Sequence, residues 1–237
     1  MKPLIIAHRG ASAYAHENTL EAFRIAVEMG ADMIELDVRR TGDGTLIVLH
    51  DGVINGRPVG EQEYDEIHAY GVSMGFIVPT LADTLDYTAG KIGMNIELKE
   101  EGYESDVADL ALKHFGSEDL VITSSLDGAV QRIKDRFPAI TTGLVLGASI
   151  YPSGLRNILP GRRIKATGAD ILSVDARLMR FGFMALNRRL RRPVYVWTVN
   201  DRKTIWRLLS TGGVEGIFTD RPDVALFLRE VFHRAQS

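Results

Sequence analysis

The chain has 237 residues, of which 45% are hydrophobic and 25% are charged, a composition that supports a sizeable globular core. Its formal net charge of -3 gives no reason to expect a nucleic-acid partner, and the absence of cysteine excludes disulfides and thiolate metal sites. The apolar run at Leu4–Ala7 is too short for the core of a signal peptide, and no segment approaches the roughly 20 apolar residues of a membrane span. We therefore expect a cytoplasmic protein without membrane contact.

Strand-like and helix-like segments alternate along the chain. Short runs rich in β-branched residues predict strands, and segments with apolar residues at helical spacing lie between them. The predicted strands are 4–8, 33–38, 94–99, 120–125, 141–146, 171–176, 194–199 and 216–220, and the predicted helices are 19–29, 80–89, 104–115, 127–137, 154–167, 179–190, 202–211 and 222–233. This alternation predicts a (β/α)8 barrel. An open doubly wound sheet is the alternative, but it would normally carry a glycine-rich phosphate loop after the first strand.

One segment interrupts the alternation. Residues 41–79 are too long for an ordinary connection between a strand and a helix. The Asp43-Gly44 pair predicts a turn that leads into an extra strand at Thr45–His50. We predict one barrel domain over residues 1–237, with a small insertion after the second strand, at about residues 51–79, that lies over the barrel mouth.

Acidic side chains stand at the carboxyl ends of two predicted strands. Residues two apart on a strand face the same side, so Glu35 and Asp37 point together, as do Glu97 and Lys99. In a barrel these positions lie at the catalytic rim. Three carboxylates that meet there repel one another unless they are protonated, paired or bound to a cation. We expect one divalent cation, and all-oxygen ligation favours Mg²⁺ or Ca²⁺ over Zn²⁺.

Basic side chains end two other strands at the same rim. His8 and Arg9 follow the first strand, and His50 ends the inserted strand, from which it can fold over the mouth. A single histidine at a strand end is commonly structural, but two on one rim with three carboxylates favour a catalytic site that also binds an anion. Asn18, followed by Glu21 in the pattern of a capping box, could equally be no more than a helix start.

Taken together, these motifs resemble those of the glycerophosphodiester phosphodiesterase family. They follow the order of the family over almost the whole chain, and their combination is far more specific than any one of them. The matching residues are His8-Arg9-Gly10, Glu17-Asn18-Thr19, Glu21-Ala22-Phe23, Gly30-Ala31-Asp32, Ile34-Glu35-Leu36-Asp37-Val38, Asp43-Gly44, His50-Asp51, Pro79-Thr80-Leu81, Glu97-Leu98-Lys99, Trp197-Thr198-Val199-Asn200 and Thr219-Asp220-Arg221-Pro222.

The resemblance implies a phosphoric diester hydrolase that cuts a small glycerophosphodiester into glycerol 3-phosphate and an alcohol. His8 and His50 would be the acid–base pair, although the sequence does not divide the two roles between them. The glycerol 2-hydroxyl would attack first and give a cyclic phosphate, which water then opens. The implied metal ligands are Glu35, Asp37 and Glu97.

The resemblance also implies the residues that hold the substrate. Arg9 and Lys99 would contact the phosphate, and Trp197 would line the glycerol or leaving-group side. Asp175, at the end of the sixth predicted strand, is a candidate for contact with glycerol hydroxyls. His16 stands where the family usually has proline, and we expect no catalytic role for it. The segment after His50 also departs from the family pattern, which leaves the preferred leaving alcohol open.

Two other functions remain as alternatives. A metal-assisted lyase or isomerase acting on a phosphorylated sugar would usually bind phosphate with glycine-rich loops after the last two strands, but Gly212-Gly213 precedes the eighth strand and lies on the opposite face. A barrel that binds without catalysis is the other alternative, against which the filled catalytic positions speak. The basic run at residues 177–192 could attract anionic lipid, although its apolar positions fit the inner face of an outer helix. The oligomeric state is left open.

Overall fold

The computed structural model describes residues 2–148 and 154–236. Within them, parallel strands close into a barrel, because β1 pairs in parallel with both β11 and β2. The (β/α)8 prediction is therefore confirmed, and the open sheet is wrong. In their order around the barrel the strands are β1 (Leu4–His8), β2 (Met33–Arg40), β6 (Gly93–Leu98), β7 (Leu120–Ser124), β8 (Thr141–Leu146), β9 (Ile171–Asp175), β10 (Val194–Trp197) and β11 (Gly216–Thr219).

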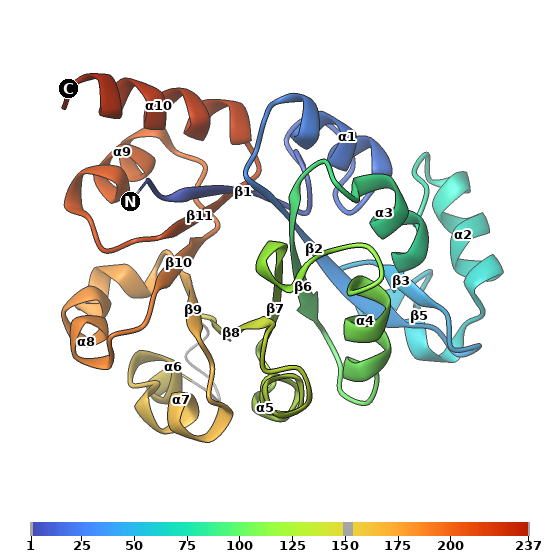
Figure 1. Ribbon diagram of the computed structural model, residues 1–237. Coiled ribbons are helices and arrows are strands. Elements are labelled where there is room, and N and C mark those ends of the chain that lie inside the picture. Colours follow the sequence, from blue (N-terminus) through green and yellow to red (C-terminus); the bar gives the residue numbers. More distant parts are fainter. Residues whose placement is uncertain (1, 149–153, 237) are drawn as a thin grey trace.

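Helices surround the barrel on its outside (Figure 1). They are α1 (Leu20–Glu28), α3 (Leu81–Thr88), α4 (Glu104–Ala111), α5 (Asp127–Arg136), α6 (Gly154–Ile158), α7 (Gly161–Thr167), α8 (Phe183–Leu190), α9 (Arg202–Thr211) and α10 (Pro222–Arg234). No helix of the described residues is long and apolar enough to cross a membrane.

Two predicted helices are not continuous. The one at 154–167 divides into α6 and α7 at Pro160, the residue that precedes α7, because proline lacks an amide hydrogen and clashes with the preceding turn. The one at 179–190 divides into a 3₁₀ turn at Leu178–Phe181 and α8, with Gly182 between them at φ 74°. Phe183 of α8 is buried in the outer core, as the apolar positions of the basic run predicted.

The barrel interior has an apolar floor beneath a polar mouth. The floor is a cluster of inward-facing side chains: Ile6, Met33, Val121, Ile171, Tyr195 and Phe218. Since side chains alternate along a strand, the next inward residue after each floor residue lies nearer the mouth, the end where the parallel strands have their carboxyl ends. His8 follows Ile6 in this way, Glu35 follows Met33, and Trp197 follows Tyr195.

The segment between β2 and α3 forms a small substructure, here called the insertion. Its strand β3 (Leu46–Val48) pairs antiparallel with β2, which confirms the strand expected at Thr45–His50 in a shorter form. A hairpin of β4 (Val53–Ile54) and β5 (Arg57–Pro58) follows, then η1 (Val59–Glu61) and α2 (Tyr64–Ser73). The insertion has an apolar cluster of its own, made of Ile47, Ile54, Val59, Ile67 and Val78. In Figure 1, α2 lies beyond α3, at the side of the barrel.

An ion pair ties together three elements at the end of the barrel opposite the mouth. Asp32, just before β2, accepts a hydrogen bond of 2.6 Å from the Ile5 amide of β1. The same carboxylate pairs with Arg229 of α10, whose guanidinium also donates to the Pro3 carbonyl at 3.0 Å. This position is distant from the rim, so the group stabilises barrel closure and touches no site residue.

We expect Asp32→Ala to lower the free energy of unfolding by about 2 kcal/mol, because it removes charged hydrogen bonds and leaves the Ile5 amide without its acceptor. Urea denaturation measures this change. The matched control is Arg234→Ala in α10, the helix that carries Arg229. It removes an exposed ion pair with Glu230 and should change stability little. Equal losses in both variants would contradict the assignment.

Candidate active site

Three carboxylates meet at the mouth of the barrel. Asp37 of β2 lies beside Glu97 of β6 in the sheet register, and Glu35 precedes Asp37 on the same face. Each of the three offers an oxygen, and these oxygens lie within 4.8 Å of one another. Burial, together with the charges of Asp37 and Glu97, raises the pKa of Glu35 to about 8. The site therefore resists ionisation of all three carboxylates unless a further positive charge is present, and its hard oxygen donors fit a divalent cation such as Mg²⁺ or Ca²⁺.

Two cations contact this cluster. The Lys99 Nζ lies 3.0 Å from an oxygen of Asp37 and 3.0 Å from an oxygen of Glu97. The Arg9 Nε lies 3.2 Å from Asp37, but its N–H is not aligned with any acceptor in the described residues, so a buried donor remains unsatisfied at the mouth. Burial alone would raise the pKa of Asp37, but the Lys99 and Arg9 charges and the Asn18 hydrogen bond hold it below its usual value. Both predicted phosphate contacts thus lie beside the predicted metal ligands.

The loop from β1 to α1 is shaped to present these groups. Gly10 has φ 82°, and a Cβ there would lie 2.8 Å from Ala22, so the loop can approach α1 closely only with glycine. The interpretation of Asn18 as a helix start is wrong. The hydroxyl of Thr19 caps α1, whereas Asn18 has φ 57° and donates to an Asp37 oxygen at 2.9 Å. Glu17 accepts from the Arg9 guanidinium at 2.8 Å.

The carboxylate partner of His8 is Asp220, a residue to which the sequence alone gave no role. The His8 Nδ1 lies 2.7 Å from Asp220, which directly follows β11, and Asp220 also accepts from the Ser12 hydroxyl at 3.1 Å and from the Asn200 amide. Burial works to lower the pKa of His8, but the Asp220 hydrogen bond and the Glu35 charge outweigh it and raise the value. With an ionised Asp220, Nδ1 carries the hydrogen and Nε2 is left for the substrate.

His50 is held from two sides. Its Nδ1 lies 2.8 Å from the neighbouring Asp51 carboxylate. Its backbone carbonyl accepts two hydrogen bonds from the Arg39 guanidinium, at 2.8 and 2.6 Å, and Arg39 also pairs with Glu100. Arg39 is the penultimate residue of β2 and was not singled out from the sequence, where two adjacent arginines at a strand end carry no signal for such a contact.

The remaining predicted residues differ in their surroundings. Trp197 ends β10, and its buried indole Nε1 has no hydrogen-bond partner in the described part of the chain. Asp175 is buried, and its oxygens accept from the Arg177 side chain and backbone and from the Ala148 amide, contacts that hold the loops after β8 and β9. His16 lies against the insertion, where its ring stacks on Phe76 with 3.9 Å between the ring centres.

Comparisons with known proteins agree with this geometry. The sequence profile of the glycerophosphoryl diester phosphodiesterase family matches residues 8–224. The chain is 36% identical to the Bacillus subtilis protein YhdW, over 92% of this chain and 95% of that protein. It is 33% identical to a glycerophosphodiester phosphodiesterase of Bacillus altitudinis, over 95% of this chain and 98% of that protein.

A solved structure supports the same relationship. The crystal structure of a glycerophosphodiester phosphodiesterase from Agrobacterium tumefaciens superimposes with a TM-score of 0.74 at 29% identity, covering 94% of this chain and 98% of the other. The likeness extends over sequence and fold together, and the predicted phosphoric diester hydrolase is confirmed. This chain belongs to the glycerophosphoryl diester phosphodiesterase family.

Proposed function

We propose that this chain hydrolyses small glycerophosphodiesters to glycerol 3-phosphate and an alcohol, with His8 and His50 as acid–base pair. The observation that carries the proposal is the convergence at one barrel mouth of two carboxylate-anchored histidines, two cations and three clustered carboxylates. A phosphodiester is an anion that repels its nucleophile, so cleavage requires positive charge beside the phosphate and proton transfer on both sides of the phosphorus.

The carboxylates Glu35, Asp37 and Glu97 would hold one divalent cation, Mg²⁺ or Ca²⁺. When bound, such a cation offsets the charge of the phosphate and polarises it toward attack. Arg9 would also offset the charge of the phosphate, because its unsatisfied Nε–H is a donor that already lies at the mouth. Lys99, which contacts two of the carboxylates, adds a second cation within reach of a bound phosphate.

The two histidines move the protons. One removes the proton of the glycerol 2-hydroxyl, whose oxygen bonds to phosphorus, and the other protonates the departing alcohol as its bond to phosphorus breaks. In the second step a water oxygen bonds to phosphorus as the bond to the 2-oxygen breaks. One histidine takes a proton from the water and the other gives one to the 2-oxygen, which leaves glycerol 3-phosphate. The 2-hydroxyl is fixed next to the phosphorus by the substrate itself, which supplies a large entropic advantage. Asp220 and Asp51 orient the two rings, and Arg39 positions the backbone of His50.

Metal binding can be measured without turnover. After chelation, adding Mg²⁺ or Ca²⁺ at about a hundredfold its Kd should stabilise the protein by roughly 2.7 kcal/mol, seen as a higher Tm. Glu35→Gln should abolish this shift and keep the fold, whereas Glu101→Gln, outside the cluster, should retain it. The chelated enzyme should be inactive. Full turnover with the metal shown to be gone would contradict the proposal.

The histidines should act as a unit. His8→Ala and His50→Ala should each lower kcat by roughly 10²–10⁴-fold without unfolding the protein, because both lie outside the apolar core. The double variant should lose little more than the worse single one. Asp220→Asn should also lower kcat, because an amide no longer holds the His8 tautomer, while Ser12→Ala should cost less. Multiplicative losses in the double variant would show independent action.

The substrate's 2-hydroxyl is the third test. A 2-deoxy diester should bind competitively through its phosphate and react slower by several orders of magnitude, in line with effective molarities of about 10⁵–10⁸ M for intramolecular attack. Phosphorus NMR with a slow variant should detect a five-membered cyclic phosphate from the true substrate. Cleavage of the deoxy compound at a comparable rate would instead establish direct attack by water, with the site residues unchanged.

A further inference from the structure

A cleft lies between the β1–α1 loop and the insertion, beside the residues assigned to acid–base catalysis and to metal and phosphate binding. It encloses about 570 Å³, a volume typical of small-molecule sites. Ser12, His16 and Glu17 line it from the loop, and the insertion lines the other side. The stacked rings of His16 and Phe76 join the two walls.

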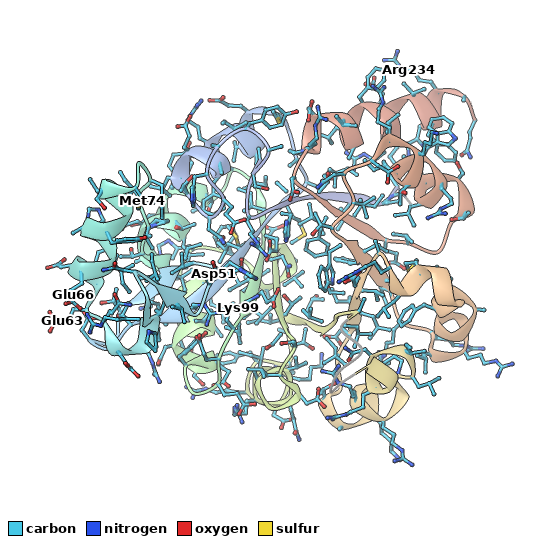
Figure 2. The ribbon with its side chains drawn as sticks, turned by 180° about the vertical axis from the view of Figure 1, so that it is seen from behind. Asp51, Glu63, Glu66, Met74, Lys99 and Arg234 are labelled. Carbon is cyan, nitrogen blue, oxygen red and sulfur yellow. The ribbon has the colours of Figure 1, made fainter. Side chains whose placement is uncertain are left out.

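The cleft is continuous with the catalytic residues through three of its lining side chains. Ser12 donates to the Asp220 carboxylate and to the His8 carbonyl. Glu17 pairs with Arg9, and Asp51 pairs with His50. In the view of Figure 2, Asp51 lies between Lys99 and Met74, and Met74 lines the cleft. A diester whose phosphate lies at Arg9 and Lys99 can therefore place one of its two alcohol groups next to this cleft.

The lining has a distinct chemistry. The insertion contributes the apolar and aromatic side chains of Val53, Tyr70, Met74 and Phe76, and the walls nearest the site carry the carboxylates of Glu17 and Asp51. None of the described lining residues is lysine or arginine. Aromatic faces and carboxylates attract a compact, weakly hydrated cation, and quaternary ammonium groups are the ligands best suited to such surfaces. A polyol would instead leave much of this apolar wall unmatched.

We propose that this cleft binds the leaving alcohol of the diester and favours an alcohol that carries a quaternary ammonium group over a polyhydroxylated one. The inference rests on the proposed diester hydrolysis and adds the identity of the leaving group. Tyr70, Met74 and Phe76 determine specificity, because they contact the alcohol and none of them reaches the acid–base residues. His16 positions Phe76 through their stacked rings.

The test compares two diesters that share the glycerophosphate half, glycerophosphocholine and glycerophosphoglycerol. The metal-loaded wild type should show a kcat/KM about fivefold higher for glycerophosphocholine, which is the ratio that one or two cation–π contacts supply. Phe76→Leu keeps an apolar side chain but removes the aromatic face, and should abolish most of this ratio while the glycerophosphoglycerol value stays within about twofold. Met74→Ala should reduce the ratio less.

Val72→Ala is the matched control for Met74→Ala. Both side chains are exposed on the insertion, Val72 at 52% and Met74 at 60%, but Val72 does not line the cleft. The Val72 variant should keep the wild-type ratio. Equal kcat/KM values for both diesters in the wild type, or a ratio that Phe76→Leu leaves unchanged, would overturn the cleft assignment and leave the hydrolysis intact.

A binding measurement separates this proposal from the proposed function. Calorimetric titration with free choline should give binding to the wild type and to the Val72 variant, and weaker binding to Phe76→Leu. Failure of the proposed function would appear as no turnover of either diester by the metal-loaded protein. Choline binding that Phe76→Leu weakens would then still support the cleft, and absence of choline binding would overturn it.

Discussion

The site depends on one constraint, the accumulation of three carboxylates at the mouth of a barrel where water is scarce. Burial and the mutual repulsion of these groups raise the pKa of Glu35 to about 8, so the protein alone does not stabilise all three carboxylates in their charged form. Lys99 balances part of the charge through Asp37 and Glu97, and Arg9 adds to it from the first strand. Ionisation of the third carboxylate therefore needs a further positive charge, which a bound divalent cation would supply. The carboxylates thus account for a metal at the site, and that metal together with Arg9 and Lys99 would attract an anionic diester.

The two histidines proposed as the acid–base pair depend on contacts that the closed barrel provides. His8 ends β1 and Asp220 follows β11, and the parallel pairing of these strands brings the two side chains to 2.7 Å. His50 comes from the insertion, yet Arg39 at the end of β2 holds its carbonyl with two hydrogen bonds. Asp220 and Asp51 thus hold the two rings, while the pairing of β1 with β11 and the Arg39 contact hold the two backbones, which limits rotation of each ring away from the site.

Local periodicity accounts for what the sequence could predict. Alternation along single strands places Glu35 with Asp37, and the register between β2 and β6 adds Glu97. The partnership of His8 with Asp220 could not be derived in this way, because it joins residues 212 apart and arises from barrel closure. Helix α2 was not identified either. Its N-terminal cap is Glu63, which forms a capping box with Glu66, whereas serine, threonine, aspartate or asparagine usually marks a helix start. Few of the residues of α2 are buried, so its apolar periodicity is weak.

The residues proposed for catalysis and those proposed for selectivity belong to different parts of this fold. The carboxylates, Lys99 and His8 lie on or directly after barrel strands, whose positions are fixed by neighbours on both sides. The apolar wall of the cleft belongs to the insertion, which has its own cluster around Ile47 and Ile67 and meets the β1–α1 loop at the stack of His16 and Phe76. Side chains on that wall can change without altering the register of any barrel strand, because their packing lies outside the main core. With the proposed assignments, substitutions at positions such as Met74 and Phe76 would therefore change the preferred leaving alcohol without moving the groups proposed to cleave the diester.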